Sequence, residues 1–169
     1  MYNIIKHPNR ILEERMPEFE FNNPIVDPKE LEQKLIETMF AYKAIGLAAN
    51  QVGLKTRVFV MGTVDGPELT RAYFNPSVLD MDEETYDEIE GCLSFPGIYV
   101  KIKRPVKISC RWQDSSGEWQ EGEFAGYGSK CFLHELDHLD GIVYKEKVSR
   151  LKWDLAVKKS KGKNNGRSK

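Results

Sequence analysis

Apolar residues along this chain recur first at the spacing of a helix, then at the spacing of strands, and near the end at helical spacing again. From residue 28 to residue 43 they lie three and four positions apart, and Asp27 followed by Pro28 is a typical helix start. We therefore predict a helix over residues 28–43. Its apolar positions are Leu31, Leu35, Ile36, Met39 and Phe40.

The middle of the chain has the pattern of β-strands. Short runs rich in β-branched and aromatic residues are separated by Gly, Pro, Asp and Ser, and residues 114–117 (DSSG) predict a hairpin turn. The segment 46–53, by contrast, is too rich in Gly and Ala for a regular element, and we expect tight backbone packing there. The predicted strands cover residues 57–61, 72–79, 98–102, 106–112 and 118–124.

Helical spacing returns near Gly128 and continues to Gly141, which predicts a buried helix. A last amphipathic helix begins near Val148, with Leu151, Leu155 and Trp153 on its apolar side. No repeat or linker divides the chain. We predict an α+β fold, with mainly antiparallel strands around a central metal-binding helix. A single catalytic domain would span residues 1–157, followed by a basic, flexible tail over residues 158–169.

Length and composition are those of an ordinary globular domain. The chain has 169 residues, of which 40% are hydrophobic and 30% charged. A formal net charge of −1 does not select nucleic acid or membranes as partners. Three cysteines without close pairing do not suggest a disulfide framework. No apolar run approaches a membrane span and no signal peptide is evident, so we expect a monomeric cytoplasmic protein without membrane contact.

Charge is distributed unevenly along the chain. Residues 80–90 contain seven acidic groups and no basic one, which favours a solvated loop and strand edge. Residues 158–169 contain six basic groups and no acidic one. Such a tail could contact RNA phosphates, or it could be a solvated end that serves only solubility.

Residues 134–138 read HELDH, and this stretch carries the clearest chemistry. Two histidines four residues apart on a helix lie one turn apart on nearly the same side, so both rings can reach one cation. Glu135, beside the first histidine, is placed to exchange protons with a metal-bound water. Only three histidines occur in the chain, and two of them fall at ligand spacing. We therefore predict that His134 and His138 bind a metal.

Cys92, in the Gly-containing segment 90–94 (EGCLS), provides a third ligand and leaves a fourth position open. Cys131 is a weaker candidate, because it lies seven residues before His138, about 10 Å along a helix axis. We expect Cys131 to be a small apolar wall residue and Cys110 a strand core residue. Thiolate and imidazole ligands suit zinc, ferrous iron or nickel, so ligand type alone does not select the metal.

Three motifs together resemble the signature motifs of peptide deformylases, in that family's order. They are residues 45–51 (IGLAANQ), 90–94 (EGCLS) and 134–138 (HELDH), and the resemblance extends over residues 1–155. It implies a metal-dependent hydrolase that removes the N-formyl group from formyl-methionine at the start of nascent polypeptides. It favours Fe2+ as the metal ion, with Zn2+ or Ni2+ as substitutes. Ala44 departs from the family pattern, in which the first motif begins with Gly.

Residues 95–99 (FPGIY) resemble the plastid-type branch of the type 1 enzymes, in which Tyr99 replaces a substrate-contacting Arg. The resemblance assigns metal binding to Cys92, His134 and His138, and proton transfer to Glu135. The Gln51 amide and the Leu93 backbone N–H would stabilise the oxyanion. The residues that it implies for substrate binding are Ile45, Gly46, Gly97, Tyr99, Tyr127 and Cys131.

Several of these residues also have ordinary structural interpretations. Gln51 could simply close a loop, the glycines could form turns, and Tyr127 could be a core residue. Glu90 and Asp137 are placed to support the histidine ligands, although Asp137 could instead pair with Arg104.

Two other functions use the same ligands. A zincin-type metallopeptidase would share HExxH and usually has His or Glu as its third ligand. No histidine follows His138, and the acidic candidates after it are Asp140, Glu146 and Asp154. A zinc-stabilised binding module would need four protein ligands, and this chain offers three and the displaced Cys131.

Overall fold

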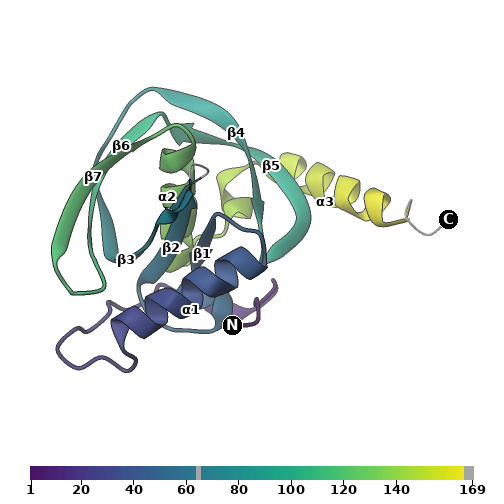
Figure 1. Ribbon diagram of the computed structural model, residues 1–169. Coiled ribbons are helices and arrows are strands. Elements are labelled where there is room, and N and C mark those ends of the chain that lie inside the picture. Colours follow the sequence, from purple (N-terminus) through teal and green to yellow (C-terminus); the bar gives the residue numbers. More distant parts are fainter. Residues whose placement is uncertain (64–65, 166–169) are drawn as a thin grey trace.

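The computed structural model describes residues 1–63 and 66–165, and in it antiparallel strands surround a central helix (Figure 1). A five-stranded sheet has the order β1-β2-β3-β6-β7, and β4 and β5 form a second, two-stranded sheet. The first sheet comprises β1 (Gly46–Ala48), β2 (Val58–Thr63), β3 (Gly66–Met81), β6 (Lys107–Gln113) and β7 (Trp119–Ala125). The second comprises β4 (Thr85–Cys92) and β5 (Phe95–Pro105). All these pairings are antiparallel, which confirms the predicted α+β class.

Helix α1 (Pro28–Ala41) confirms the helix predicted from the first apolar pattern. The Asp27 side chain accepts hydrogen bonds from the backbone N–H groups of Lys29 and Glu30, at 3.0 and 2.9 Å. These bonds satisfy two of the N–H groups that a helix start leaves without partners. The buried side of α1, with Leu31 and Leu35, packs against β2 and β3 and covers one part of the sheet.

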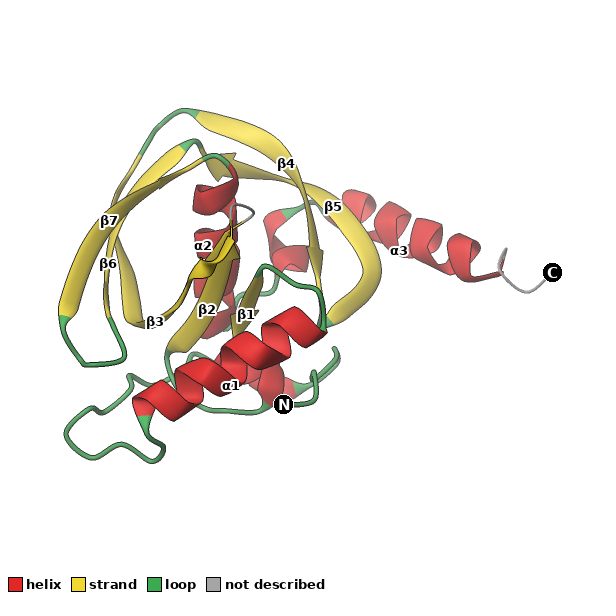
Figure 2. Cartoon of the chain, viewed as in Figure 1, coloured by secondary structure: helices red, strands yellow, loops and turns green. Residues whose placement is uncertain are grey.

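Helix α2 (Tyr127–Leu139) is the predicted central helix, and it lies between the two sheets (Figure 2). It packs against β1, β2, β5 and β7. Phe132 and Leu139 are fully buried in its contacts with the sheets. Strands therefore surround the one helix that carries both histidines of the HELDH motif.

Residues 46–53 contradict our expectation that this segment lacks regular structure. They contain β1 and a short 3₁₀ helix, η2 (Ala49–Val52). Strand β1 pairs with β2, and a hydrogen-bonding partner is what stabilises a strand made of small residues. Gly53 ends the 3₁₀ helix with φ of 87°, a conformation that favours glycine.

The acidic segment 80–90 is more ordered than we predicted. Residues 85–92 form β4, which pairs with β5 along its whole length. Asp87 of β4 lies opposite Lys103 of β5, whereas Glu88 and Glu90 lie opposite the apolar residues Ile102 and Val100. Cross-strand pairing stabilises a strand that its composition alone would not predict.

Helix α3 (Arg150–Asn165) extends the predicted last helix. We expected a flexible tail from residue 158, but residues 158–165 are helical, and residues 166–169 lie outside the described part of the chain. Trp153 and Ala156 pack against the cluster around β5, whereas Leu151 and Leu155 are 69% and 59% exposed. The prediction for this helix was thus right for Trp153 and wrong for Leu151 and Leu155. Of the helices described, none combines the length and apolar character that a membrane span requires.

Candidate active site

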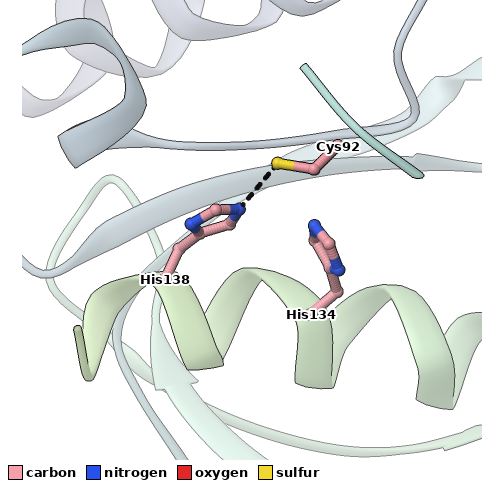
Figure 3. Close-up of side chains that lie close together, drawn as sticks. All are labelled: Cys92, His134 and His138. Carbon is pink, nitrogen blue, oxygen red and sulfur yellow. Dashed lines mark hydrogen bonds between the residues drawn. The ribbon is translucent and has the colours of Figure 1, made fainter. Parts of the chain in front are cut away.

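His134 and His138 rise from the same side of α2 toward Cys92, which lies at the end of β4 (Figure 3). The Cys92 sulfur lies 3.2 Å from Nε2 of His138. Ligand atoms of these three side chains all lie within 4.8 Å of one another. This spacing is close to what bonds of about 2.0–2.3 Å to one shared ion permit. Cys131 does not join the group, and its sulfur instead approaches the Ile45 carbonyl oxygen at 3.8 Å.

The electrostatics of the three side chains suit a cation. Burial alone would raise the pKa of the Cys92 thiol, but the neighbouring His138 and His134 rings hold it well below its usual value. Burial alone would lower the pKa of His134, but hydrogen bonds with Cys92 and Glu90 raise it well above its usual value. The group thus stabilises a thiolate beside positive charge, and a divalent cation would supply that charge in place of protons. The donor set and its charge therefore fit a divalent metal.

A buried ion pair orients the first histidine. Nδ1 of His134 lies 2.8 Å from Oε2 of Glu90, which leaves Nε2 available as the ligand atom. Arg104 donates two hydrogen bonds to Glu90, at 2.6 and 3.0 Å. Burial alone would raise the pKa of Glu90, but the hydrogen bonds from His134 and Arg104 lower it to about 2. Glu90 is therefore an ionised acceptor that fixes the orientation of the ring.

Asp137 and Asn50 stabilise the helix that carries the histidines. Asp137 accepts a 2.7 Å hydrogen bond from Arg104 and pairs with Lys147 at 3.0 Å. Of the two roles that the sequence left open for Asp137, the structure shows the pairing with Arg104. The Asn50 amide donates to the His138 carbonyl oxygen at 2.7 Å and so links the first motif to α2.

Glu135 lies beside the three ligands and is only 4% exposed. Burial raises the pKa of its carboxyl group to about 7, against the opposing charges of His134 and His138. Its Oε2 atom is buried and has no hydrogen-bond partner among the described residues. A carboxyl group with such a pKa can both accept and release a proton near neutral pH. A buried oxygen without a hydrogen-bond partner, such as Oε2 of Glu135, needs a polar group beside it, for example a water.

The side chain of Gln51 has a defined orientation toward the same centre. Its oxygen accepts a 2.9 Å hydrogen bond from the Ala48 backbone N–H. Its nitrogen therefore points away from that strand, 3.4 Å from the Cys92 sulfur and 3.2 Å from the Ser94 hydroxyl. Leu93 follows Cys92 directly and lines the adjoining cavity. Two potential donors, the Gln51 amide and the Leu93 backbone, thus lie next to the ligand group.

Comparison with known proteins agrees with this arrangement of motifs. The model of the polypeptide deformylase family matches residues 1–153, which is most of the chain. The chain belongs to the polypeptide deformylase family. The match identifies the family and not its plastid-type branch, which stays a prediction.

Individual peptide deformylases are similar to this chain over most of their own length. The peptide deformylase of Thermotoga maritima is 44% identical over 131 residues, which is 78% of either chain. That of Novosphingobium aromaticivorans is 35% identical, with 92% of this chain and 93% of the relative covered. The crystal structure of a peptide deformylase from Legionella pneumophila has a TM-score of 0.88 and 27% identity, and it covers 100% of this chain and 99% of its own.

A cavity of about 620 Å³ adjoins the deformylase motifs. His134, Glu135, Gln51, Cys92 and Leu93 all line it. The six residues expected to bind substrate, Ile45, Gly46, Gly97, Tyr99, Tyr127 and Cys131, line it as well. Three separate parts of the deformylase chain, β1, the β4–β5 turn and α2, thus form one concave surface.

The structure adds residues that the sequence did not single out. Ser94 is fully buried and accepts a hydrogen bond from Gln51, although it belongs to the second motif and was assigned no role. Lys130 is buried in the cavity wall, one helical turn before His134. A lysine inside an apolar helical pattern was the signal that could have identified it.

Gly46 is required by the position of Glu135. A Cβ atom at residue 46 would lie 2.3 Å from Oε1 of Glu135. We expect Gly46→Ala to displace this carboxylate and to lower deformylase turnover by about 10²-fold, since misplacing a reacting group by about 1 Å can cost that much. Formate release measures the effect. Gly162→Ala on α3, where an added Cβ meets nothing within 4 Å, is the matched control and should leave turnover unchanged. An active Gly46→Ala variant would contradict this assignment.

Proposed function

We propose that this chain is a metal-dependent deformylase that hydrolyses the N-formyl group of formyl-methionine at the start of nascent polypeptides and releases formate. The observation that carries the proposal is the buried Glu135 carboxyl group beside the Cys92, His134 and His138 ligand set. Membership of the polypeptide deformylase family supports it. A zincin-type peptidase is less consistent with a cysteine as the third ligand.

A divalent cation held by the three ligands would activate water and polarise the formyl carbonyl group. Glu135 accepts the proton of the attacking water and passes it to the departing amine. The new bond joins the water oxygen to the formyl carbon, and the bond that breaks joins this carbon to the methionine nitrogen. As negative charge develops on the carbonyl oxygen, the Gln51 amide and the Leu93 backbone N–H donate hydrogen bonds to it. The products are formate and a free N-terminal amine.

Selection of a formyl group follows from the crowding at this end of the cavity. The Cys131 sulfur approaches the Ile45 carbonyl oxygen at 3.8 Å, and Gly46 lies directly against Glu135. A formyl group is the smallest acyl group, so walls at these positions favour it over acetyl by size. Ile45, Tyr127 and Cys131 would surround the methionine side chain, while Gly97 and Tyr99 lie where the following backbone could extend.

For the metal we propose Fe2+, with Ni2+ or Zn2+ as substitutes, since thiolate and imidazole ligands suit all three. We expect protein purified without oxygen to contain iron and to release formate from a formyl-Met peptide. Exposure to air should inactivate it, and anaerobic Fe2+ or Ni2+ should restore the activity. Elemental analysis and a formate assay measure both properties. An aerobic zinc form as fast as the iron form would exclude the iron assignment but not the enzyme, whereas no formate with any metal would exclude the enzyme.

We also propose that the basic end of α3 contacts the ribosome. Residues 158–169 contain six basic groups, and four of them, Lys161, Lys163, Arg167 and Lys169, follow Ser160. Helix α3, which carries the start of this segment, leaves the body of the molecule (Figure 1). Basic side chains bind RNA phosphates with strong salt dependence. Truncation after Ser160 should leave turnover on a short formyl-Met peptide unchanged and lower co-sedimentation with ribosomes at low salt. Equal co-sedimentation of both proteins would leave this end as a solvated terminus.

A thiolate ligand requires a reducing compartment, so we keep the cytoplasm as the proposed location. A monomer likewise stays a prediction.

A further inference from the structure

Lys130 is a buried cation in the wall of the substrate cavity. It lies on α2, one turn before His134, and is only 8% exposed. Lysine is rarely this buried unless its ammonium group has partners. The mechanism proposed above does not use this group.

The contacts of the Lys130 ammonium group are long. The nitrogen lies 3.4 Å from the Ile89 carbonyl oxygen and 3.9 Å from the Glu88 carboxylate. It also lies 4.0 Å from the centre of the Tyr127 ring, which is a cation–π contact. An ammonium group has three donors, and good N–H···O bonds are shorter, at about 2.7–3.2 Å. Because all three contacts are long, the ammonium group can exchange one of them for a shorter hydrogen bond to an acceptor that enters the cavity.

The side chains beside Lys130 in the cavity wall are otherwise apolar or aromatic. Ile89, Tyr127 and Cys131 all line this part. In a pocket of this kind, one well-placed polar group determines which ligand fits best. Burial raises the pKa of the Cys131 thiol well above its usual value, so Cys131 adds no charge there. The Lys130 ammonium group is thus positioned to select a side chain that carries a hydrogen-bond acceptor.

We propose that Lys130 determines specificity by donating a hydrogen bond to the polar atom of the first side chain, so that the enzyme accepts formyl peptides whose methionine is oxidised to the sulfoxide. This inference rests on the proposed function, because it uses Tyr127 and Cys131 as the methionine pocket. The thioether sulfur of methionine is a weak acceptor, whereas the sulfoxide oxygen makes the side chain polar. An apolar pocket of the same size would leave that oxygen without a hydrogen-bond partner, which disfavours binding of the sulfoxide.

The test compares two substrates that differ in this acceptor. Formyl-methionine-sulfoxide-Ala-Ser has the oxygen, and formyl-norleucine-Ala-Ser has an unbranched apolar side chain without it. The quantity measured is the ratio of their kcat/KM values, sulfoxide to norleucine. Lys130→Met removes the ammonium group and keeps an unbranched side chain, and we expect it to lower the ratio about ten-fold or more.

Lys43→Met is the matched control. Lys43 also lines the cavity but is exposed, so we expect its replacement to leave the ratio unchanged. Calorimetric affinities of the two deformylated peptides provide a second measurement, and Lys130→Met should weaken only the sulfoxide peptide. An unchanged ratio in Lys130→Met would overturn the inference, and so would an equal fall in both variants. Formate release from the norleucine peptide separates this failure from failure of the proposed function, which would abolish release from both substrates.

Discussion

Glu135→Gln is expected to keep the metal and the fold and to lower the rate of formate release by about 10²-fold or more. Glutamine has nearly the same shape, so the buried side chain should remain beside His134 and His138. It cannot accept the proton that Glu135 takes from water. The loss should therefore appear in kcat, with little change in metal content or thermal midpoint.

Glu121→Gln is the matched control for this variant, because Glu121 is an exposed carboxylate on β7 outside the cavity. It should retain full turnover. Elemental analysis, thermal unfolding and single-turnover formate release together separate a chemical defect from loss of metal or fold. Near-normal turnover by metal-loaded Glu135→Gln protein would remove Glu135 from the mechanism.

Cys92→Ser should bind little or none of the metal and should lose activity as a consequence. A serine hydroxyl is a poorer ligand than a thiolate for iron, nickel or zinc. The neighbouring imidazoles do not ionise a serine hydroxyl. By contrast, burial alone would raise the pKa of Cys92, but His138 and His134 hold it well below its usual value. The ratio of metal to protein after dialysis measures the effect directly.

Cys131→Ala is the discriminating control, because Cys131 was the competing thiol in the sequence. Its sulfur lies near the Ile45 carbonyl oxygen, and burial keeps its thiol protonated by raising its pKa well above the usual value. We expect this variant to retain the metal. Full occupancy in Cys92→Ser, or loss of metal in Cys131→Ala, would show that the ligand set is different.

Local patterns were sufficient to predict α1 and α2, because most of their apolar positions are buried, although Phe40 of α1 is 46% exposed. The same regularity identified the two histidines, since positions i and i+4 of a helix share one side whatever surrounds it. The motifs likewise indicated Cys92 and Glu135. These residues could be predicted because the features that identify them lie within a few positions along the chain.

Local patterns failed where a partner distant in sequence stabilises the element. Strand β1 depends on pairing with β2, and β4 depends on pairing with β5, so composition alone suggested irregular backbone. For α3, contact of Trp153 with the core around β5, and not the spacing of Leu151 and Leu155, determines the buried side.

Why several site positions carry their particular residues also depends on tertiary contacts. That residue 46 must lack a side chain follows from the approach of Glu135, which lies 89 residues further along the chain. The buried environment that raises the pKa of Glu135 to about 7 forms only when α2 is enclosed by the sheets. The surroundings of Lys130 are also tertiary, because its ammonium group lies 3.4 Å from the Ile89 carbonyl oxygen of β4. The sequence by itself thus determined which groups could bind a metal and exchange a proton, whereas only tertiary packing decided their spacing, their desolvation and the shape of the pocket beside them.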